Sequence, residues 1–493
     1  MIHAMPTIPS YQKIREFCIE SVMYGTWLLL SLLWLKEDHL IRDGDEEGHV
    51  GAMELCKELV AEQGWLAWIS NMFWGNMGEY PPVFASLYGA IWYIMEQCVQ
   101  HPIEPNQLIL RMWLLLCPIT TMIAVGQIAK HLSLSKNLAR IVCLYLPLLN
   151  GVSRHYMPEN LVLVWTVLSI LFAIRASTTN KTLDYTILGI FLAFGLLSKQ
   201  TFVIVALVSV AWMFYIHRGT WTWWKMIFML FLCVSITTPW YLPSLATQLE
   251  YMRRSVASNI EISVWMQILF YPSVMLFLGT LWLFPLGIFA YWKNSQNRHV
   301  PNTAFPKELL GWVISLVILM GIPKQYPRML LPYVPLIALG FAYLYQRAKE
   351  SHIWVLYAVC IGNLYLCSFY PSSTEFFYTQ IYETIDDRCP QRWLRPPYRD
   401  DFHLREILQF AQKHPYPIVI VTDMDIPCSI QSTHSWSYHV APYLRRNGID
   451  RDVFTTEDIP NIYSAHYIRI AWDERTDNFP PGFYLSLAPT IAP

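Results

Sequence analysis

The residues best suited to chemistry lie in a short acidic stretch, Asp43-Gly44-Asp45-Glu46-Glu47, just after the first apolar run of the chain. That run, from about Ile19 to Leu35, is long enough to cross a bilayer, since about 20 apolar residues span its hydrocarbon core. A carboxylate held where a span leaves the membrane can accept a proton from an attacking hydroxyl group. We therefore expect an enzyme whose catalytic residues, Asp45 and Glu46, work at the membrane surface.

The carboxylates precede a stretch with helical spacing, from His49 to Glu62. Its apolar residues fall on one side and its charged residues on the other, which is typical of a helix that lies in the membrane interface. Such a helix would hold Asp45 at its amino-terminal end. The plain structural alternative is an acidic first turn that caps a solvated helix and interacts favourably with its dipole.

Three basic residues are candidates for binding an anion on the same face of the membrane. Lys199 interrupts an apolar region, where a charged lysine costs about 2.5–3.5 kcal/mol on insertion scales. Lys324 and Arg328 lie in a turn between two apolar runs, and the planar guanidinium of arginine suits a phosphate group. We expect the three to neutralise a lipid phosphate. The alternative is a snorkelling lysine and a turn that anchors the chain to lipid headgroups.

A further set of polar residues is expected to line a cavity beside the carboxylates or to contact an acceptor. Arg154 and Glu159 open another apolar run, where they form either a structural pair or part of that cavity. The set comprises His49, Glu79, Tyr80, Arg154, His155 and Glu159. The two histidines could bind a divalent metal together with a carboxylate, but no tight ligand spacing supports such a site. No metal ligand is therefore assigned, and a divalent metal stays an open alternative.

The composition sets the class of protein. The 493-residue chain is 54% hydrophobic and only 14% charged, whereas a soluble domain is roughly 25% charged. Repeated apolar runs of spanning length then predict an all-α polytopic membrane protein. The net charge of -1 gives no indication of a partner, and no basic stripe suggests nucleic acid. The sequence has no Gly-rich phosphate loop and no signature of an ATP-driven pump.

Eleven spans account best for the charge pattern, because every second connection between the apolar runs is then basic, as cytoplasmic loops are. The amino terminus would lie in the cytoplasm and the carboxyl terminus outside. The pattern requires Pro82–Cys98 to lie as a juxtamembrane or re-entrant helix; as a twelfth span it would place the basic loops outside. The spans expected after the first are Leu108–Ala129, Leu138–Leu149, Leu161–Arg175, Tyr185–Leu197, Phe202–Ile216, Met226–Leu242, Trp265–Tyr291, Leu309–Ile322, Leu330–Tyr345 and Ile353–Phe369.

Two domains are expected. Residues 1–370 would form the transmembrane domain, with residues 37–81 as its first outer loop. Residues 371–493 would form a small extracytoplasmic α/β domain, because charged residues make up about a fifth of this tail and about an eighth of the chain before it. The tail has helical spacing at Phe402–Lys413 and at His439–Asn447, and a short apolar β run at Pro417–Thr422.

Six segments, in this order, resemble the GT-C glycosyltransferases, and in particular the group of the protein mannosyltransferases and aminoarabinose transferases. The resemblance covers roughly Tyr24 to Tyr345 and rests on the order of the segments. They are Asp45-Glu46, Tyr80-Pro81-Pro82, Arg154-His155-Tyr156-Met157-Pro158-Glu159, Leu196-Leu197-Ser198-Lys199, Pro239-Trp240-Tyr241 and Arg328-Met329-Leu330-Leu331-Pro332.

The resemblance implies a membrane-embedded helical bundle with an external cavity, a polyprenyl- or dolichyl-phosphate sugar donor, and inversion at the anomeric carbon. Asp45 resembles the catalytic aspartate of the family and Glu46 its usual neighbour. Lys199 matches a lysine near a span end, and Arg328 matches the arginine of an Arg-Tyr-Leu-Leu-Pro type motif. The chain differs from the common family pattern at Ser198, Gln200 and Met329. It also has Gly48 and His49 where aminoarabinose transferases tend to carry Arg and Tyr, which argues against aminoarabinose as the sugar.

We therefore expect an inverting glycosyltransferase that moves a sugar from a polyprenyl-phosphate donor to a glycan, lipid or protein acceptor. It would act on the outer face of a bacterial inner membrane, in contact with membrane lipids and without a nucleotide. The alternatives are a transporter or flippase of lipid-linked glycans and a non-catalytic scaffold subunit. A transporter would more often show inverted repeats with broken helices, and the sequence shows no such repeat.

Overall fold

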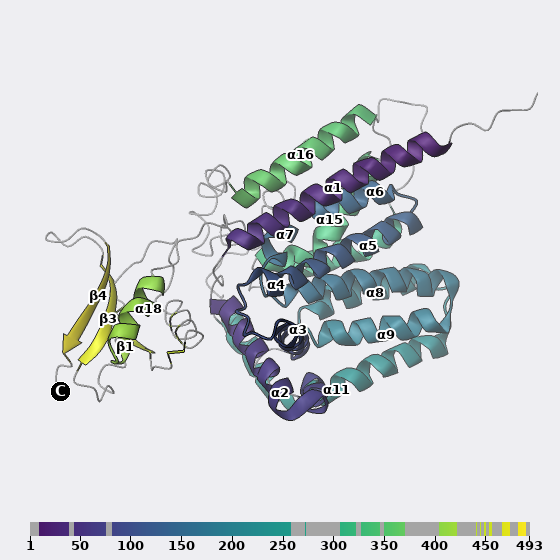
Figure 1. Ribbon diagram of the computed structural model, residues 1–493. Coiled ribbons are helices and arrows are strands. Elements are labelled where there is room, and N and C mark those ends of the chain that lie inside the picture. Colours follow the sequence, from purple (N-terminus) through teal and green to yellow (C-terminus); the bar gives the residue numbers. More distant parts are fainter. Residues whose placement is uncertain are drawn as a thin grey trace, which may run out of the picture.

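The computed structural model describes a large helical part and a smaller part with strands (Figure 1). The described residues are 9–38, 44–74, 81–257, 272, 306–321, 327–345, 350–369, 404–421, 440, 444, 448–449, 453–455, 466–473 and 482–489.

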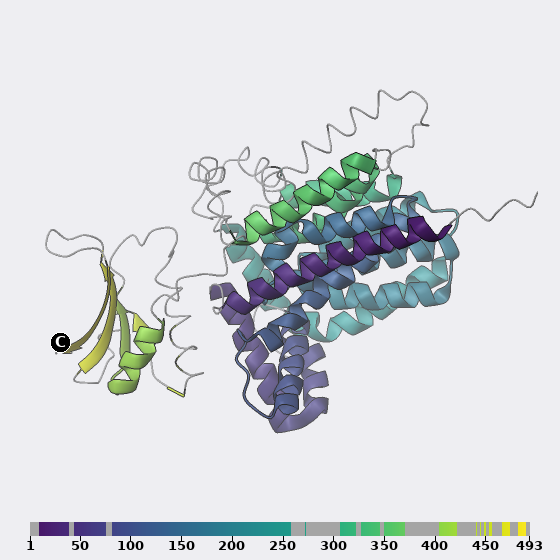
Figure 2. The ribbon, with the colours of Figure 1, turned by 45° about the horizontal axis from the view of Figure 1, so that its top comes forward.

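Apolar helices packed side by side make up the large part, and their buried faces form one extended core. In Figure 1, α5, α8, α9 and α11 follow one another as neighbours, and Figure 2 shows α1, in purple, running beside α16, in green. The long elements are α1 (Pro9–Glu37), α5 (Leu116–His131), α6 (Lys136–Tyr145), α8 (Glu159–Thr179), α9 (Thr182–Leu196), α10 (Val208–Ile216), α11 (Trp223–Ala257), α14 (Leu310–Met320), α15 (Val334–Tyr345) and α16 (Glu350–Phe369). The short ones are α4 (Leu108–Arg111), η1 (Met112–Leu115), α7 (Pro147–Ser153), the π-helical η2 (Val203–Leu207), η4 (Lys307–Leu309) and η5 (Pro327–Tyr333).

Among the helical segments that the structure describes, five are long and apolar enough to cross a membrane, and the chain is an integral membrane protein of the predicted all-α polytopic class. These segments are Phe17–Glu37, Leu108–His131, Glu159–Thr179, Trp223–Glu250 and Arg328–Tyr345. Three shorter apolar helices accompany them, at Thr182–Leu196, Val203–Ile216 and Ile353–Leu366. The span expected at Trp265–Tyr291 lies outside the described residues apart from Pro272, so the number of eleven spans stays a prediction.

The expected continuous span Leu138–Leu149 is wrong. The chain breaks at Leu146, whose backbone is extended with ψ 129°, between α6 and α7. The cause is Pro147, which has no N–H to donate and disfavours a helical conformation in the residue before it. The amide of Asn150 compensates for the break, because it donates to the carbonyl oxygens of Leu144 (2.7 Å) and Leu146 (3.0 Å).

The segment predicted as the first outer loop contains a helix, α2 (Gly44–Trp74), that packs against α3 (Val83–Val99). The expected apolar side is confirmed, since Met53, Cys56 and Val60 are buried. The two backbones approach closely at Gly89, where an added Cβ would lie 2.5 Å from the carbonyl oxygen of Met53. In Figure 1, α3 is seen end-on while α8 and α9 run across the view, so α3 lies crosswise to the bundle. This orientation favours the expected juxtamembrane helix over a twelfth span.

The smaller part contains α18 (Leu404–Lys413) and a four-stranded sheet of order β2-β1-β3-β4. The helix and β1 (Ile418–Val421) fall where the sequence predicted them, and β-branched residues form that strand. β1 pairs in parallel with β2 (Val453–Thr455) and β3 (His466–Asp473), and β3 pairs antiparallel with β4 (Gly482–Pro489). Of the expected helix His439–Asn447, Val440 and Leu444 are described, and both are helical. The extracytoplasmic location of this part stays a prediction.

Candidate functional site

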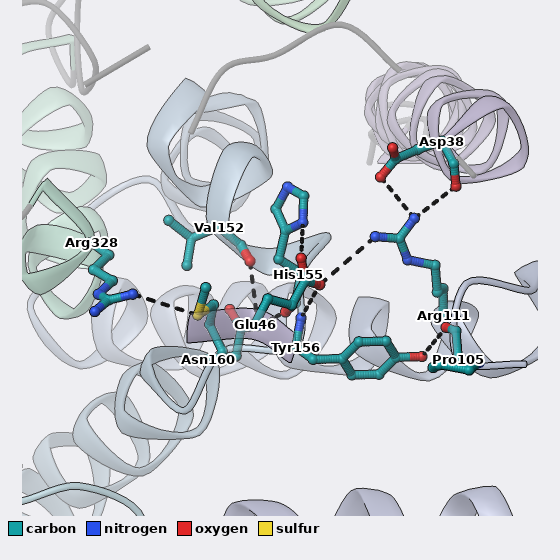
Figure 3. Close-up of polar contacts among 10 residues, drawn as sticks. Asp38, Glu46, Pro105, Arg111, Val152, His155, Tyr156, Asn160 and Arg328 are labelled. Atoms are coloured by element: carbon teal, nitrogen blue, oxygen red, sulfur yellow. Dashed lines mark hydrogen bonds and ion pairs between the residues drawn. The ribbon is translucent and has the colours of Figure 1, made fainter. Parts of the chain in front are cut away.

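Glu46 lies in the first turn of α2 and is completely buried (Figure 3). Its Oε1 accepts a hydrogen bond from the backbone N–H of Tyr156 at 2.9 Å, and its Oε2 lies 3.1 Å from Nδ1 of His155. These contacts join residues more than a hundred positions apart in the chain. They attach the amino-terminal end of α2 to the segment that links α7 and α8.

The electrostatic surroundings keep Glu46 ionised. Burial by itself would raise the pKa of this carboxyl group, but the charges of His155 and Arg111 and the N–H of Tyr156 act in the opposite direction and hold the pKa well below its ordinary value. A carboxylate that accepts hydrogen bonds from cationic and backbone donors is stabilised in its charged form. Glu46 therefore serves this site as a permanent negative charge held by protein groups.

Arg111 and Asp38 support this carboxylate, and sequence reasoning missed both. Nη1 of Arg111 donates to the side chain of Asp38 (2.8 Å) and to its backbone carbonyl (2.9 Å), and Nη2 lies 3.8 Å from Oε1 of Glu46 (Figure 3). Both Arg111 and Asp38 are fully buried. The available signal was the place of each charge: Asp38 follows the first apolar run, and Arg111 stands near the start of a later one. Charges in such places are either interfacial anchors or members of a buried pair.

Arg154 is buried beside the same cluster. Its Nη1 donates to Oγ of Ser368 at 2.9 Å, and its guanidinium lies 5.0 Å from the ring centroid of Trp34. Burial lowers the pKa of Arg154 to about 9, an effect that the charge of Asp38 partly offsets. Of the two alternatives for Arg154 and Glu159, the structural pair is not found, because Arg154 faces α1 and the end of α16 while Glu159 faces other cations.

Glu159, at the start of α8, instead forms ion pairs with two of the predicted phosphate-binding residues. Its Oε1 lies 2.7 Å from Nζ of Lys199 and 2.9 Å from Nε of Arg328. All three side chains are less than one-tenth exposed. Nη1 of Arg328 also contacts Sδ of Met157 at 3.8 Å (Figure 3). The structure thus brings Lys199 and Arg328 together, as expected from the sequence. They meet around Glu159, which was predicted from the sequence to line a cavity.

Several backbone groups position the turn that carries Lys199. The carbonyl oxygen of Leu197 accepts from the N–H of Val83 at the start of α3 (3.1 Å), and Oγ of Ser198 accepts from Nε1 of Trp165 (3.1 Å). Gln200 donates to Gln248 of α11. A π-helical turn, η2, follows directly, and such turns occur frequently at functional sites.

The segment 154–159 joins the residues around Glu46 to the residues around Glu159. Glu46 binds its residues 155 and 156, while Glu159, at its other end, binds Lys199 and Arg328. Nδ2 of Asn160 donates to the carbonyl oxygen of His155 at 2.9 Å, which holds the bend of this segment in place (Figure 3). The amino-terminal end of α2 and the cationic pair therefore meet on one short, buried stretch of chain.

The other predicted site residues are only partly described. Asp45 lies in the first turn of α2, next to Glu46. His49 is 8% exposed, and its ring packs edge-on against Phe84. The side chain of Asp45 and the residues Glu79, Tyr80 and Lys324 lie outside what the structure describes.

The metal alternative gains no support from the described side chains. Among them, no three His, Cys, Asp or Glu residues come together as a metal site. One of the two candidate ligands, His155, directs its Nδ1 to Glu46.

Three comparisons place this architecture among known proteins. Residues 91–242 match the family described as dolichyl-phosphate-mannose-protein mannosyltransferase. No curated protein matches the sequence. Among solved structures, the fold is similar to ArnT from Cupriavidus metallidurans in the apo state (TM-score 0.53) and bound to undecaprenyl phosphate (TM-score 0.57). Each match is 12% identical in sequence and covers 92% of both chains.

The resemblance read from the six sequence segments is confirmed in its fold and in the family matched. The family match lies in the first half of the chain and includes Arg111, the 154–159 segment and Lys199. The chain has the fold of ArnT, and residues 91–242 match the mannosyltransferase family.

Proposed function

We propose that this protein is an inverting glycosyltransferase that takes a sugar from a polyprenyl-phosphate donor and transfers it to a hydroxyl group at the outer face of a bacterial inner membrane. One observation carries the proposal. The amino-terminal end of α2, with Asp45, and the cations Lys199 and Arg328 are fixed to the same buried segment, 154–159. A base and a phosphate-binding pair are the two parts that such a reaction requires.

The reaction assigns a role to each part. Asp45 accepts the proton of the acceptor hydroxyl as its oxygen attacks the anomeric carbon. A bond forms between this oxygen and the anomeric carbon, while the bond from the anomeric carbon to the phosphate oxygen breaks. The electron pair of the broken bond stays with the phosphate oxygen. Attack and departure on opposite sides of the carbon give inversion.

Lys199 and Arg328 would stabilise the negative charge that develops on the leaving phosphate. Their buried position strengthens this effect, because electrostatic interactions are stronger where water is excluded. Lys324, which precedes Arg328 by four residues in the sequence, is proposed to assist them.

Glu46 is proposed as a positioning residue. It is fully buried, and its contacts go to His155, Tyr156 and Arg111. It would therefore hold Asp45 in place through the first turn of α2. His49, Glu79, Tyr80, Arg154 and His155 stay proposed cavity or acceptor residues.

The comparisons support the class of donor. One matched family acts with dolichyl-phosphate-mannose, and the similar ArnT structure contains undecaprenyl phosphate. The donor proposed here is accordingly a polyprenyl-phosphate-linked hexose or pentose. The acceptor is a glycan, a lipid or a protein, and residues 371–493 are proposed to cover the site from the extracytoplasmic side.

Transfer by the purified protein tests the proposal. The detergent-solubilised protein is incubated with radiolabelled polyprenyl-phosphate sugars and a panel of acceptors, together with the variants Asp45→Asn and Glu58→Gln. We expect transfer by the wild type and by Glu58→Gln, which changes an exposed carboxylate of the same helix, and none by folded Asp45→Asn. Transfer by Asp45→Asn would exclude Asp45 as the base. Movement of the lipid across vesicles without transfer would support a flippase instead.

A further inference from the structure

The second half of α2 folds back on the first half. Gly64, with φ 82° and ψ 179°, interrupts the helix. Nδ2 of Asn71 donates to Sγ of Cys56 at 3.6 Å, whereas an unbroken helix would separate two residues 15 positions apart by about 22 Å. Gly64 therefore divides α2 into a helical hairpin, with residues 44–63 as its first half and residues 65–74 as its second half.

One face of the second half packs on α3. Nε1 of Trp68 donates to the backbone carbonyl oxygen of Ser86 at 2.8 Å. The ring centroid of Trp65 lies 5.9 Å from that of Tyr93, and the two rings meet edge to face. These contacts fix the orientation of the second half, and with it the face that points away from α3.

That opposite face is apolar and exposed. Leu66 is 82% exposed and Trp74 is 60% exposed, and Ile69 is exposed between them. The second half contains no charged residue, whereas the first half exposes the carboxylates of Glu58 and Glu62. A group of exposed apolar side chains of this kind marks a surface that contacts a membrane or another molecule.

The neighbouring helix indicates that the partner is the membrane. α2 contacts α11, whose segment Trp223–Glu250 is long and apolar enough to span a bilayer (Figure 1). α11 also exposes Leu242, Leu245 and Leu249, so the two helices both present apolar surface. The second half of α2 begins and ends with tryptophan, a residue that is enriched where the hydrocarbon core meets the headgroups.

We propose that residues 65–74 insert their exposed face into the membrane interface, at the boundary between the headgroups and the acyl chains. The side of α2 that the sequence predicted to lie there belongs to the first half and packs against α3, so the membrane contact moves to the second half. Because this segment has no lysine or arginine, apolar burial holds it in place rather than attraction to anionic headgroups. The inference concerns the protein without donor or acceptor and does not depend on the proposed function.

Photolabelling of the wild type in vesicles tests the insertion. The probe is phosphatidylcholine with a diazirine near the headgroup end of one acyl chain, and its adducts are located by tandem mass spectrometry after illumination. We expect about tenfold more adducts on residues 65–74 than on residues 58–62 of the same helix, since only the former contact acyl chains. A second probe, with the diazirine at the end of the chain, should label the exposed Val234 within the α11 span but not residues 65–74.

Two matched variants add one carboxylate to each half of α2. Leu66→Glu should reduce the adducts on residues 65–74 by about tenfold, because a charge opposes insertion among acyl chains. Ala61→Glu, at an exposed position of the first half, should leave those adducts unchanged. Replacing part of the phosphatidylcholine by phosphatidylglycerol should also leave them unchanged, because the segment carries no positive charge.

Equal labelling of residues 65–74 and 58–62, in vesicles where the second probe labels Val234, would overturn the inference. A several-fold rise in labelling with phosphatidylglycerol would overturn it as well. If Leu66→Glu does not fold, the wild-type ratio decides. A dimer in detergent that Leu66→Glu converts to a monomer would assign the surface to a second copy of the chain instead. Labelling requires no transfer, so failure of the transferase proposal would leave this inference standing.

Discussion

The pair formed by Arg111 and Asp38 allows a prediction of defined size. In Arg111→Met, the hydrophobic length of the side chain is largely kept, but Asp38 loses a charged partner at 2.8 Å and Glu46 loses a charge at 3.8 Å. Both carboxylates are completely buried. Breaking a buried ion pair by removing one partner typically costs about 3–5 kcal/mol, because the remaining charge stays buried without compensation.

A double-mutant cycle separates this cost from the loss of packing. Asp38→Asn in the Arg111→Met background removes the charge that has lost Arg111, so the double variant should be more stable than Arg111→Met alone. We expect a coupling energy of about 2 kcal/mol between the two positions, within the range seen for residues in contact. Glu46 remains in both variants, and its altered surroundings should displace the first turn of α2 and lower transfer.

The assay is unfolding of the purified protein in mixed micelles, followed by transfer activity of each variant. Arg175→Met is the control, since Arg175 also lies 2.8 Å from a carboxylate oxygen, on Asp184, but is 41% exposed. Its loss should be smaller, because the pair formed by the part-exposed Arg175 is screened by water and Asp184 keeps a hydrogen bond from the hydroxyl of Thr179 at 2.8 Å. Additive losses in the Arg111–Asp38 cycle would refute the reasoning, as would full transfer activity in Arg111→Met.

Three further predictions concern the same region. Arg328→Ala should weaken binding of undecaprenyl phosphate by about tenfold or more, measured by titration, because a charged hydrogen bond to phosphate contributes about 1.5–3 kcal/mol; unchanged affinity would count against the phosphate role. Glu46→Gln should lower the free energy of unfolding by about 2 kcal/mol at pH 7. Since the pKa of Glu46 is depressed in the folded protein, its charge stabilises the fold above its ordinary pKa of 4.5, and the gap between variant and wild type should close as the pH falls below that value. Gly89→Ala should cost about 1–3 kcal/mol, since its Cβ would press on the backbone oxygen of Met53, whereas Gly51→Ala, with open space around it, should cost nothing; equal stability of the two variants would contradict the close packing of α2 on α3.

The membrane-spanning helices could be predicted because the relevant signal lies in consecutive residues. An apolar run has no alternative in a bilayer but to form a helix that satisfies its own backbone hydrogen bonds. For this reason the boundaries expected for the spans near α8, α9 and α16 differ from the structure by only a few residues. The exception, Leu138–Leu149, failed because a hydropathy pattern does not weigh a single proline, and Pro147 divides that run.

The interface helix and the first strand of the tail could also be predicted, because the signal again lies in neighbouring residues. The side of α2 that packs on α3 follows from the spacing of its apolar residues, and β1 follows from four β-branched residues in a row. The non-helical backbone at Gly64, with φ 82°, was not expected, since one glycine in a helical pattern usually leaves the helix intact.

Residue types and their order in the chain were enough to single out Asp45, Lys199 and Arg328, because acidic and basic residues between apolar runs are few. The sequence could not predict which residues contact these groups. Glu159 binds two cations 40 and 169 positions later, and Glu46 binds a histidine 109 positions away. Such contacts depend on which helix ends meet when the bundle packs. Packing also pairs Arg111 with Asp38 in a fully buried contact, where hydropathy alone would predict a solvated anchor.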